Sequence, residues 1–139
     1  MDNNASEIAP CDRRRILVTD DETPVREIFR MILASGFRDC VIDTAINGEA
    51  AVESFLQHHQ GVILIDMKMP IMDGQTAIQK IREHCDANGW EKPGVIFCTG
   101  FTPSSSAQAL PDQDCCIIQK PVTSDQLLST VRSRLVPAS

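Results

Sequence analysis

Residues 61–66 read Gly-Val-Ile-Leu-Ile-Asp, an unbroken apolar run that ends in a carboxylate. Continuous rather than alternating apolarity predicts a strand that is buried on both faces, as in the middle of a parallel sheet. Asp66 should then emerge at the carboxyl end of that strand, where open α/β sheets bind their ligands. This stretch therefore predicts both the fold class and the place of a functional site.

Strands and helices are predicted to alternate on both sides of this run. Further apolar runs predict strands at residues 15–19, 40–45, 95–98 and 115–118. Helices are expected over residues 24–35, 49–59, 75–84 and 124–135, with a weaker one over 103–111. The alternation predicts an α/β fold, a five-stranded parallel sheet with helices on both faces and right-handed crossovers.

The first helix shows the clearest periodicity. Thr23 is expected to cap it, and Pro24 suits its first position, where the missing N–H costs nothing. Gly36 should end it. The residues expected to face the core follow the helical repeat and are Val25, Ile28, Phe29, Ile32 and Leu33.

The length of 139 residues predicts a single domain. Residues 1–13 are mostly polar and aperiodic, so we expect a flexible N-terminal arm there and the folded domain over residues 14–136. Met1 and the polar leader favour a stand-alone protein. The alternative is a domain excised from a hybrid histidine kinase or a longer regulator.

The net charge of −6 and the pI near 4.9 argue against direct binding to nucleic acid, which clustered basic residues hold. No apolar run approaches the roughly 18 residues that a membrane span needs. The six cysteines show no zinc spacing, and several sit in or beside apolar runs, so we expect free, mostly buried thiols. These features predict a cytoplasmic location.

Polar and charged residues follow the ends of four predicted strands. Asp20 and Asp21 come after the first, Asp66 ends the third, Thr99 follows the fourth and Lys120 follows the fifth. Because the carboxyl ends of parallel strands meet at one edge of the sheet, we expect these side chains to converge.

Three clustered carboxylates repel one another unless a cation is present. Mg²⁺ suits such a set because it prefers a few carboxylate oxygens, a carbonyl and waters, and Mn²⁺ could substitute. Lys120 adds a second cation, and Thr99 a hydrogen-bond donor. These are the parts that phosphoryl transfer requires, with Asp66 as the nucleophile that forms an aspartyl phosphate.

Four short motifs of the sequence resemble those of the receiver domains of two-component response regulators, of which the stand-alone chemotaxis type is the smallest. The motifs are residues 16–22 (Ile-Leu-Val-Thr-Asp-Asp-Glu), residues 66–74 (Asp-Met-Lys-Met-Pro-Ile-Met-Asp-Gly), Thr99-Gly100 and Lys120-Pro121. The resemblance covers residues 14–135, nearly the whole predicted domain. The resemblance is specific because the motifs occur in the same order as in the family, each at a predicted strand end.

The resemblance implies a (βα)5 flavodoxin-like fold with strand order 2-1-3-4-5. It implies that Asp66 is the phospho-acceptor and that Thr99 and Lys120 contact the phosphoryl oxygens. The implied metal ligands are Asp20, Asp21, Asp66 and the carbonyl of Lys68. The Lys120-Pro121 peptide is expected to be cis.

The resemblance also implies partners. The donor would be a histidine kinase or a histidine phosphotransfer protein in a phosphorelay, and the receptor of the signal a downstream protein. The surface formed by strand five and the fourth and fifth helices would bind the downstream protein and so transmit the signal. The chain would act as a monomer or weak homodimer, and it would catalyse only its own phosphorylation and dephosphorylation.

The chain departs from the family pattern in one conspicuous place. An aromatic residue normally lies three positions before the lysine and turns inward as a switch, whereas here the position holds Ile117, and the chain has no tyrosine. Coupling by an aromatic rotamer is therefore excluded at this position. Lys68 and Phe101, two residues past Asp66 and Thr99, are candidates for tuning the phosphoryl lifetime.

Three other functions share parts of this pattern. A haloacid dehalogenase-like phosphatase also uses a strand-end aspartate and Mg²⁺, but it needs a second acid where this chain has Lys68. A flavin-binding module would want a Ser/Thr/Gly phosphate loop where this chain has three acids, residues 20–22. A receiver that serves only as an interaction scaffold would not need the complete set of acids, hydroxyl and lysine.

Overall fold

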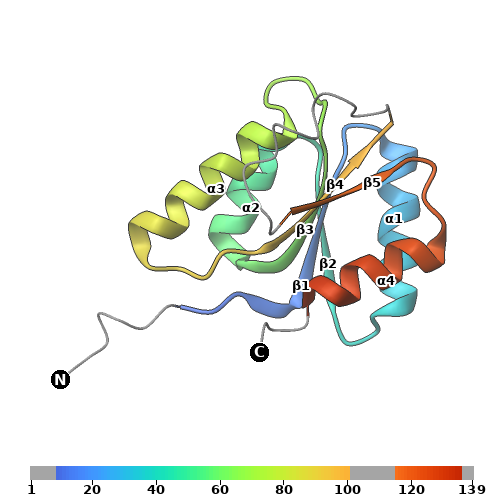
Figure 1. Ribbon diagram of the computed structural model, residues 1–139, viewed down its shortest axis with the longest axis horizontal. Coiled ribbons are helices and arrows are strands. Elements are labelled where there is room, and N and C mark those ends of the chain that lie inside the picture. Colours follow the sequence, from blue (N-terminus) through green and yellow to red (C-terminus); the bar gives the residue numbers. More distant parts are fainter. Residues whose placement is uncertain (1–8, 101–114, 136–139) are drawn as a thin grey trace.

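The structure, a computed structural model, describes residues 9–100 and 115–135, which form one parallel sheet between two helical layers (Figure 1). The strands are β1 (Asp12–Thr19), β2 (Val41–Ala45), β3 (Gln60–Asp66), β4 (Gly94–Thr99) and β5 (Cys115–Gln119), in the order β2-β1-β3-β4-β5. The helices of the described residues are α1 (Thr23–Gly36), α2 (Gly48–His58), α3 (Gly74–Asn88) and α4 (Ser124–Leu135). The predicted fold class and strand order are confirmed. The weak helix predicted at 103–111 lies outside the described residues.

Strand β3 is central because every side chain of its apolar run is buried. Val62 and Leu64 pack into the core under α1 and α4, and Ile63 and Ile65 into the core under α2 and α3. All four are 0% exposed. Each contributes on the order of 2 kcal/mol of hydrophobic stabilisation, which explains why the run does not alternate with polar residues.

Helix α1 differs from its prediction in two respects. Its N-cap is Glu22, without a side-chain hydrogen bond, and Thr23 already belongs to the helix, because the backbone N–H of Arg26 bonds the Glu22 carbonyl at 3.0 Å. Ile28, predicted to face the core, is 55% exposed. Phe29, also predicted to face the core, lies about 100° further round the helix and is buried, so the buried stripe is narrower than predicted.

The prediction of a flexible arm over residues 1–13 is wrong at its C-terminal end. Strand β1 begins at Asp12, and Ala9 forms a parallel bridge with Trp90 in the loop after α3. The backbone N–H of Asp12 also bonds the carbonyl of His59 at 2.7 Å. These are backbone contacts to distant loops, which no local periodicity reveals. Residues 1–8 lie outside the described residues.

All six thiols are free, as predicted, and four of them are buried. Cys115 packs against the α2 and α3 side of the sheet and Cys116 against the other side, as expected of neighbours in a strand. Burial raises the pKa of the Cys98 thiol to about 12. Among the helices of the described residues, none is long and apolar enough to cross a bilayer.

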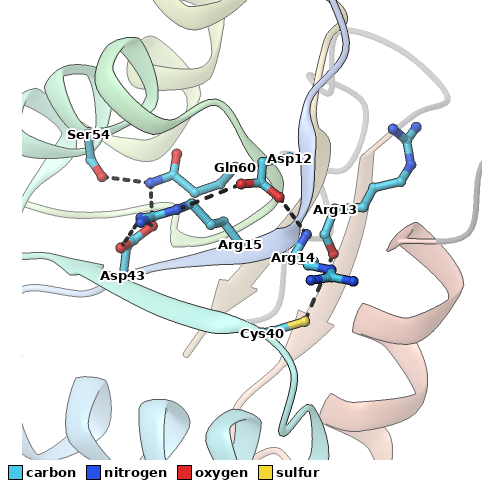
Figure 2. Close-up of polar contacts among 8 residues, drawn as sticks. All are labelled: Asp12, Arg13, Arg14, Arg15, Cys40, Asp43, Ser54 and Gln60. Carbon is cyan, nitrogen blue, oxygen red and sulfur yellow. Dashed lines mark hydrogen bonds and ion pairs between the residues drawn. The ribbon is translucent and has the colours of Figure 1, made fainter.

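Side-chain ion pairs fix the amino edge of the sheet (Figure 2). Arg15 Nη1 donates to both carboxylate oxygens of Asp43, at 2.9 and 3.0 Å, and so ties β1 to β2. The buried Gln60 amide donates to the same carboxylate and to Ser54 Oγ, at 2.9 and 2.7 Å. These contacts to Asp43 therefore hold the amino ends of β1, β2 and β3 together.

Glu91 clamps the first residues of β1 to the loop before β4. Its carboxylate accepts two hydrogen bonds from the Arg13 guanidinium, at 2.6 and 3.1 Å, and one from the Cys11 backbone N–H at 2.8 Å. The Arg13 guanidinium, with help from the Cys11 N–H, holds the pKa of Glu91 below its usual range despite partial burial. The clamp explains why the segment predicted to be flexible is ordered here.

We expect Glu91→Gln to lower the free energy of unfolding at pH 7 by about 1 kcal/mol, because the amide loses charge-assisted hydrogen bonds on a partly exposed pair. Since the pKa of Glu91 is lowered in the fold, this stability is present above the ordinary value of 4.5 and is lost as pH falls through the lowered pKa. Urea unfolding of both proteins at pH 7 and about pH 3 measures it.

Glu27→Gln is the matched control, since Glu27 also pairs with an arginine, Arg30, but on the exposed face of α1. A smaller loss is expected for it. Equal losses in the two variants, or a Glu91→Gln deficit that does not shrink as the pH falls, would contradict the clamp.

Candidate functional site

Three carboxylates converge at the carboxyl edge of the sheet, as the sequence predicts. Asp20 and Asp21 follow β1, and Asp66 ends β3, the strand beside it. One oxygen from each lies within 4.8 Å of the others. Asp20 is buried, Asp66 partly buried and Asp21 exposed, so the cluster opens to solvent on one side. Clustered carboxylate oxygens at such spacing suit a hard divalent cation.

Lys120 reaches into this cluster from the end of β5. Its Nζ lies 2.9 Å from Asp20 Oδ2 and 3.2 Å from Asp66 Oδ2. Its backbone N–H donates to the Thr99 carbonyl at 2.8 Å, and its peptide bond to Pro121 is cis, as expected. Although burial alone would lower the pKa of Lys120, its hydrogen bonds to the two carboxylates raise it, so the ammonium remains charged.

Asp66 carries a raised pKa. Burial is the main cause and the charge of Asp20 adds to it, while Lys120 and the Lys68 backbone N–H oppose the shift. That N–H donates to Asp66 Oδ1 at 3.2 Å. A carboxylate with few waters around it is poorly solvated and is stabilised by any added cation.

The remaining predicted residues divide between this edge and its surroundings. Thr99 ends β4, one residue past the partner of Asp66 in the strand register, and its side chain is fully buried. The Lys68 backbone lies at the cluster, while the residue itself is exposed. Ile117 packs partly buried on the α2 and α3 side of β5. Phe101 lies outside the described residues.

Arg26 is a contact of the site that the sequence reasoning missed. Its Nη1 turns back from α1 to donate to the Asp20 backbone carbonyl at 2.7 Å. The carboxylate of Asp20 also accepts from the Glu22 N–H at 2.9 Å, which shapes the turn into the helix. The sequence could have indicated this contact, because an arginine in the first turn of a helix can reach back to the residues that precede the helix.

The loop between β3 and α3 is held tightly against the end of β3. The Gly74 N–H bonds the Met67 carbonyl at 3.0 Å. A Cβ on Gly74 would overlap the carbonyl oxygen of Asp66 itself. Glycine is therefore required here by close backbone approach.

A five-stranded parallel sheet in the order β2-β1-β3-β4-β5, with helices on both faces, defines the flavodoxin-like class of folds. The chain matches the family model of the response regulator receiver domain over residues 16–132, and it belongs to that family. It is therefore a receiver domain of two-component signalling.

Individual relatives agree. The chain is 32% identical over 123 residues to the chemotaxis protein CheY of Bacillus subtilis, covering 87% of this chain and 97% of that protein. It is 35% identical over 96 residues to a protein-glutamate methylesterase/protein-glutamine glutaminase of Methanosarcina acetivorans, but spans only 26% of its length. Among solved structures, the REC domain of AraT from Geobacillus stearothermophilus superposes with a TM-score of 0.74 at 28% identity, covering 89% of this chain and 94% of that one.

We expect Gly74→Ala to lower the free energy of unfolding by about 1–3 kcal/mol, because the new methyl group meets backbone that cannot move aside. Gly100→Ala is the control, since a Cβ there meets nothing within 4 Å. Urea denaturation compares the two. An equal effect of both variants would show that the loop accommodates the methyl group and that close approach is not the constraint.

Proposed function

We propose that Asp66 accepts a phosphoryl group from a histidine kinase or a histidine phosphotransfer protein. The observation that carries the proposal is the shared ion pairing at the strand ends, where Lys120 Nζ lies within 3.2 Å of both Asp20 and Asp66. Family membership supports it, because receiver domains operate in two-component signalling.

In the proposed reaction, a carboxylate oxygen of Asp66 attacks phosphorus and forms a P–O bond, while the P–N bond to the donor imidazole breaks. The electron pair of that bond leaves with the imidazole, so no oxidant or reductant is needed. Lys120 would contact a phosphoryl oxygen through its charged ammonium group. Thr99 would donate a hydrogen bond to another, after its buried hydroxyl turns toward the site.

Asp20, Asp21 and Asp66 fit a bound Mg²⁺, with the Lys68 carbonyl as a further ligand, and Mn²⁺ would suit the same oxygens. When bound, the ion supplies positive charge that offsets the carboxylates and stabilises a phosphoryl group in the pocket. The fit rests on three acid oxygens within 4.8 Å of one another.

In this proposal, the phosphorylated chain binds a downstream protein through the surface formed by β5 and its flanking helices. The chain acts in the cytoplasm as a monomer or weak homodimer. The partly buried Ile117 on β5 replaces the expected aromatic switch. Movement of Thr99 would therefore have to be transmitted by the packing and the backbone of β4 and β5. Phosphorylation itself does not depend on residue 117.

Incubation with acetyl phosphate and Mg²⁺ should add the mass of one phosphoryl group to the intact chain, and Asp66→Asn should abolish the addition, because the amide is not a nucleophile. Intact-mass spectrometry measures it. Asp125→Asn, at an exposed acid in the first turn of α4, is the control and should label normally. Labelling of Asp66→Asn at the rate of the unchanged chain would refute the assignment.

Mg²⁺ should raise the Tm of the unphosphorylated chain, since a ligand that binds only the folded state stabilises by about 2.7 kcal/mol at a hundredfold excess over Kd. Asp21→Asn should shift this response to at least roughly tenfold higher Mg²⁺, because it removes one charged ligand. Thermal unfolding across a Mg²⁺ series measures both.

Glu22→Gln provides the matched control for the metal. Glu22 is the next exposed acid along the chain, but it is not part of the three-carboxylate cluster. Its Mg²⁺ response should equal that of the unchanged chain. If Glu22→Gln and Asp21→Asn weaken the response equally, the ion only screens surface charge and has no defined site.

A further inference from the structure

Two exposed isoleucines lie on neighbouring loops at the functional edge of the sheet. Ile46 directly follows β2 and is 58% exposed, and Ile71 lies in the loop after β3 and is 77% exposed. The loops touch, because a Cβ on Gly48 would lie only 2.5 Å from the Met72 carbonyl oxygen. We call the two side chains the isoleucine pair.

The backbone of Ile71 adopts a conformation that is unfavourable for its side chain. Its φ is +72°, and the Met72 N–H bonds the Pro70 carbonyl at 2.7 Å across it, which closes a tight three-residue turn. A β-branched residue is strained at positive φ, whereas glycine adopts it freely. Met69 and Met72 pack against the core, but Ile71 points away from it. Core packing therefore does not explain an isoleucine here.

Both loops are anchored to the acids. The Asp20 N–H donates to the carbonyl of Ala45, the residue before Ile46, at 3.3 Å. The loop that carries Ile71 starts at Asp66 and returns to it at Gly74, whose position leaves no room for a Cβ against the Asp66 carbonyl. The isoleucine pair is thus held in a fixed place relative to the reacting carboxylate.

We propose that the isoleucine pair is a contact surface for the protein that donates the phosphoryl group, and that it selects among donors. The inference rests on the proposed function and adds residues that the chemistry does not use. The Asp66 side chain is only 12% exposed, so a donor protein has to press its surface onto the loops around it. A small donor such as acetyl phosphate reaches Asp66 without covering them.

Charge around the pair indicates what the donor surface carries. Glu49 at the start of α2 and Asp73 just before α3 are exposed beside the two loops, and Asp21 is exposed on the loop that follows β1. A complementary surface has an apolar centre against the isoleucines and basic side chains around the phosphohistidine. Phosphoryl transfer from it should weaken as salt rises.

The test compares two phosphoryl donors on the same variants. The protein donor is a purified, autophosphorylated histidine kinase, chosen from a panel as the one that transfers fastest to the unchanged chain, and the small donor is acetyl phosphate. Ile71→Asn and Ile46→Thr should each lower kcat/KM for the kinase about tenfold or more. Labelling by acetyl phosphate should stay within about twofold, because the acids and Lys120 are untouched.

Two further variants separate contact from folding. Ile71→Gly removes the side chain and the strain together, so it should slow the kinase reaction while leaving Tm unchanged or higher. Val41→Thr alters an exposed β-branched residue at the start of β2, at the opposite edge of the sheet, and should change neither donor reaction.

Each outcome decides something. Kinase transfer to Ile71→Asn and Ile46→Thr within about twofold of the unchanged chain would overturn the inference. Parallel loss with both donors would also overturn it, since the pair would then position the chemistry. If no kinase outpaces acetyl phosphate on the unchanged chain, donor selection fails while labelling of Asp66 still stands. Failure of acetyl phosphate itself would instead count against the proposed function.

Discussion

The ammonium group of Lys120 allows carboxylates to gather at one edge of this sheet. Two unit negative charges about 4 Å apart repel by about 4 kcal/mol at the effective dielectric of a protein surface. Asp20, whose side chain is 2% exposed, has almost no water to offset that repulsion. Lys120 Nζ, placed between Asp20 and Asp66, compensates both. Three carboxylates and one ammonium still leave two negative charges, which is what a divalent cation would neutralise.

The two edges of the sheet have different properties because their polar groups are arranged differently. At the amino edge, Arg15 of β1 and Gln60 of β3 both donate to the Asp43 carboxylate of β2 and so join three strands. At the carboxyl edge, three clustered carboxylates share the ammonium of Lys120, which contacts two of them. The buried apolar β3 separates the two edges and fixes where Asp66 emerges. Rigidity at one end thus supports an electrostatically incomplete site at the other.

The sequence predicted the sheet and the convergence at its edge, because those follow from buried apolar runs and from the geometry of parallel strands. The strand order was predicted from the resemblance to receiver domains. It did not predict the exposure of Ile28, since helical periodicity gives a face but not how much of it the sheet covers. It also missed Arg26 and the pairing of Ala9. Both depend on contacts between segments that only the assembled chain brings together.

Ile117 restricts how a conformational change at the functional site can be transmitted along β5. Its β-branched side chain has restricted rotation about χ1, and it packs against the core opposite Phe97 in the strand register. A large side-chain swing is therefore unavailable on this part of β5. Thr99 and Lys120 are instead joined by a backbone hydrogen bond of 2.8 Å. This bond links the end of β4 to the backbone of the residue whose ammonium contacts Asp20 and Asp66.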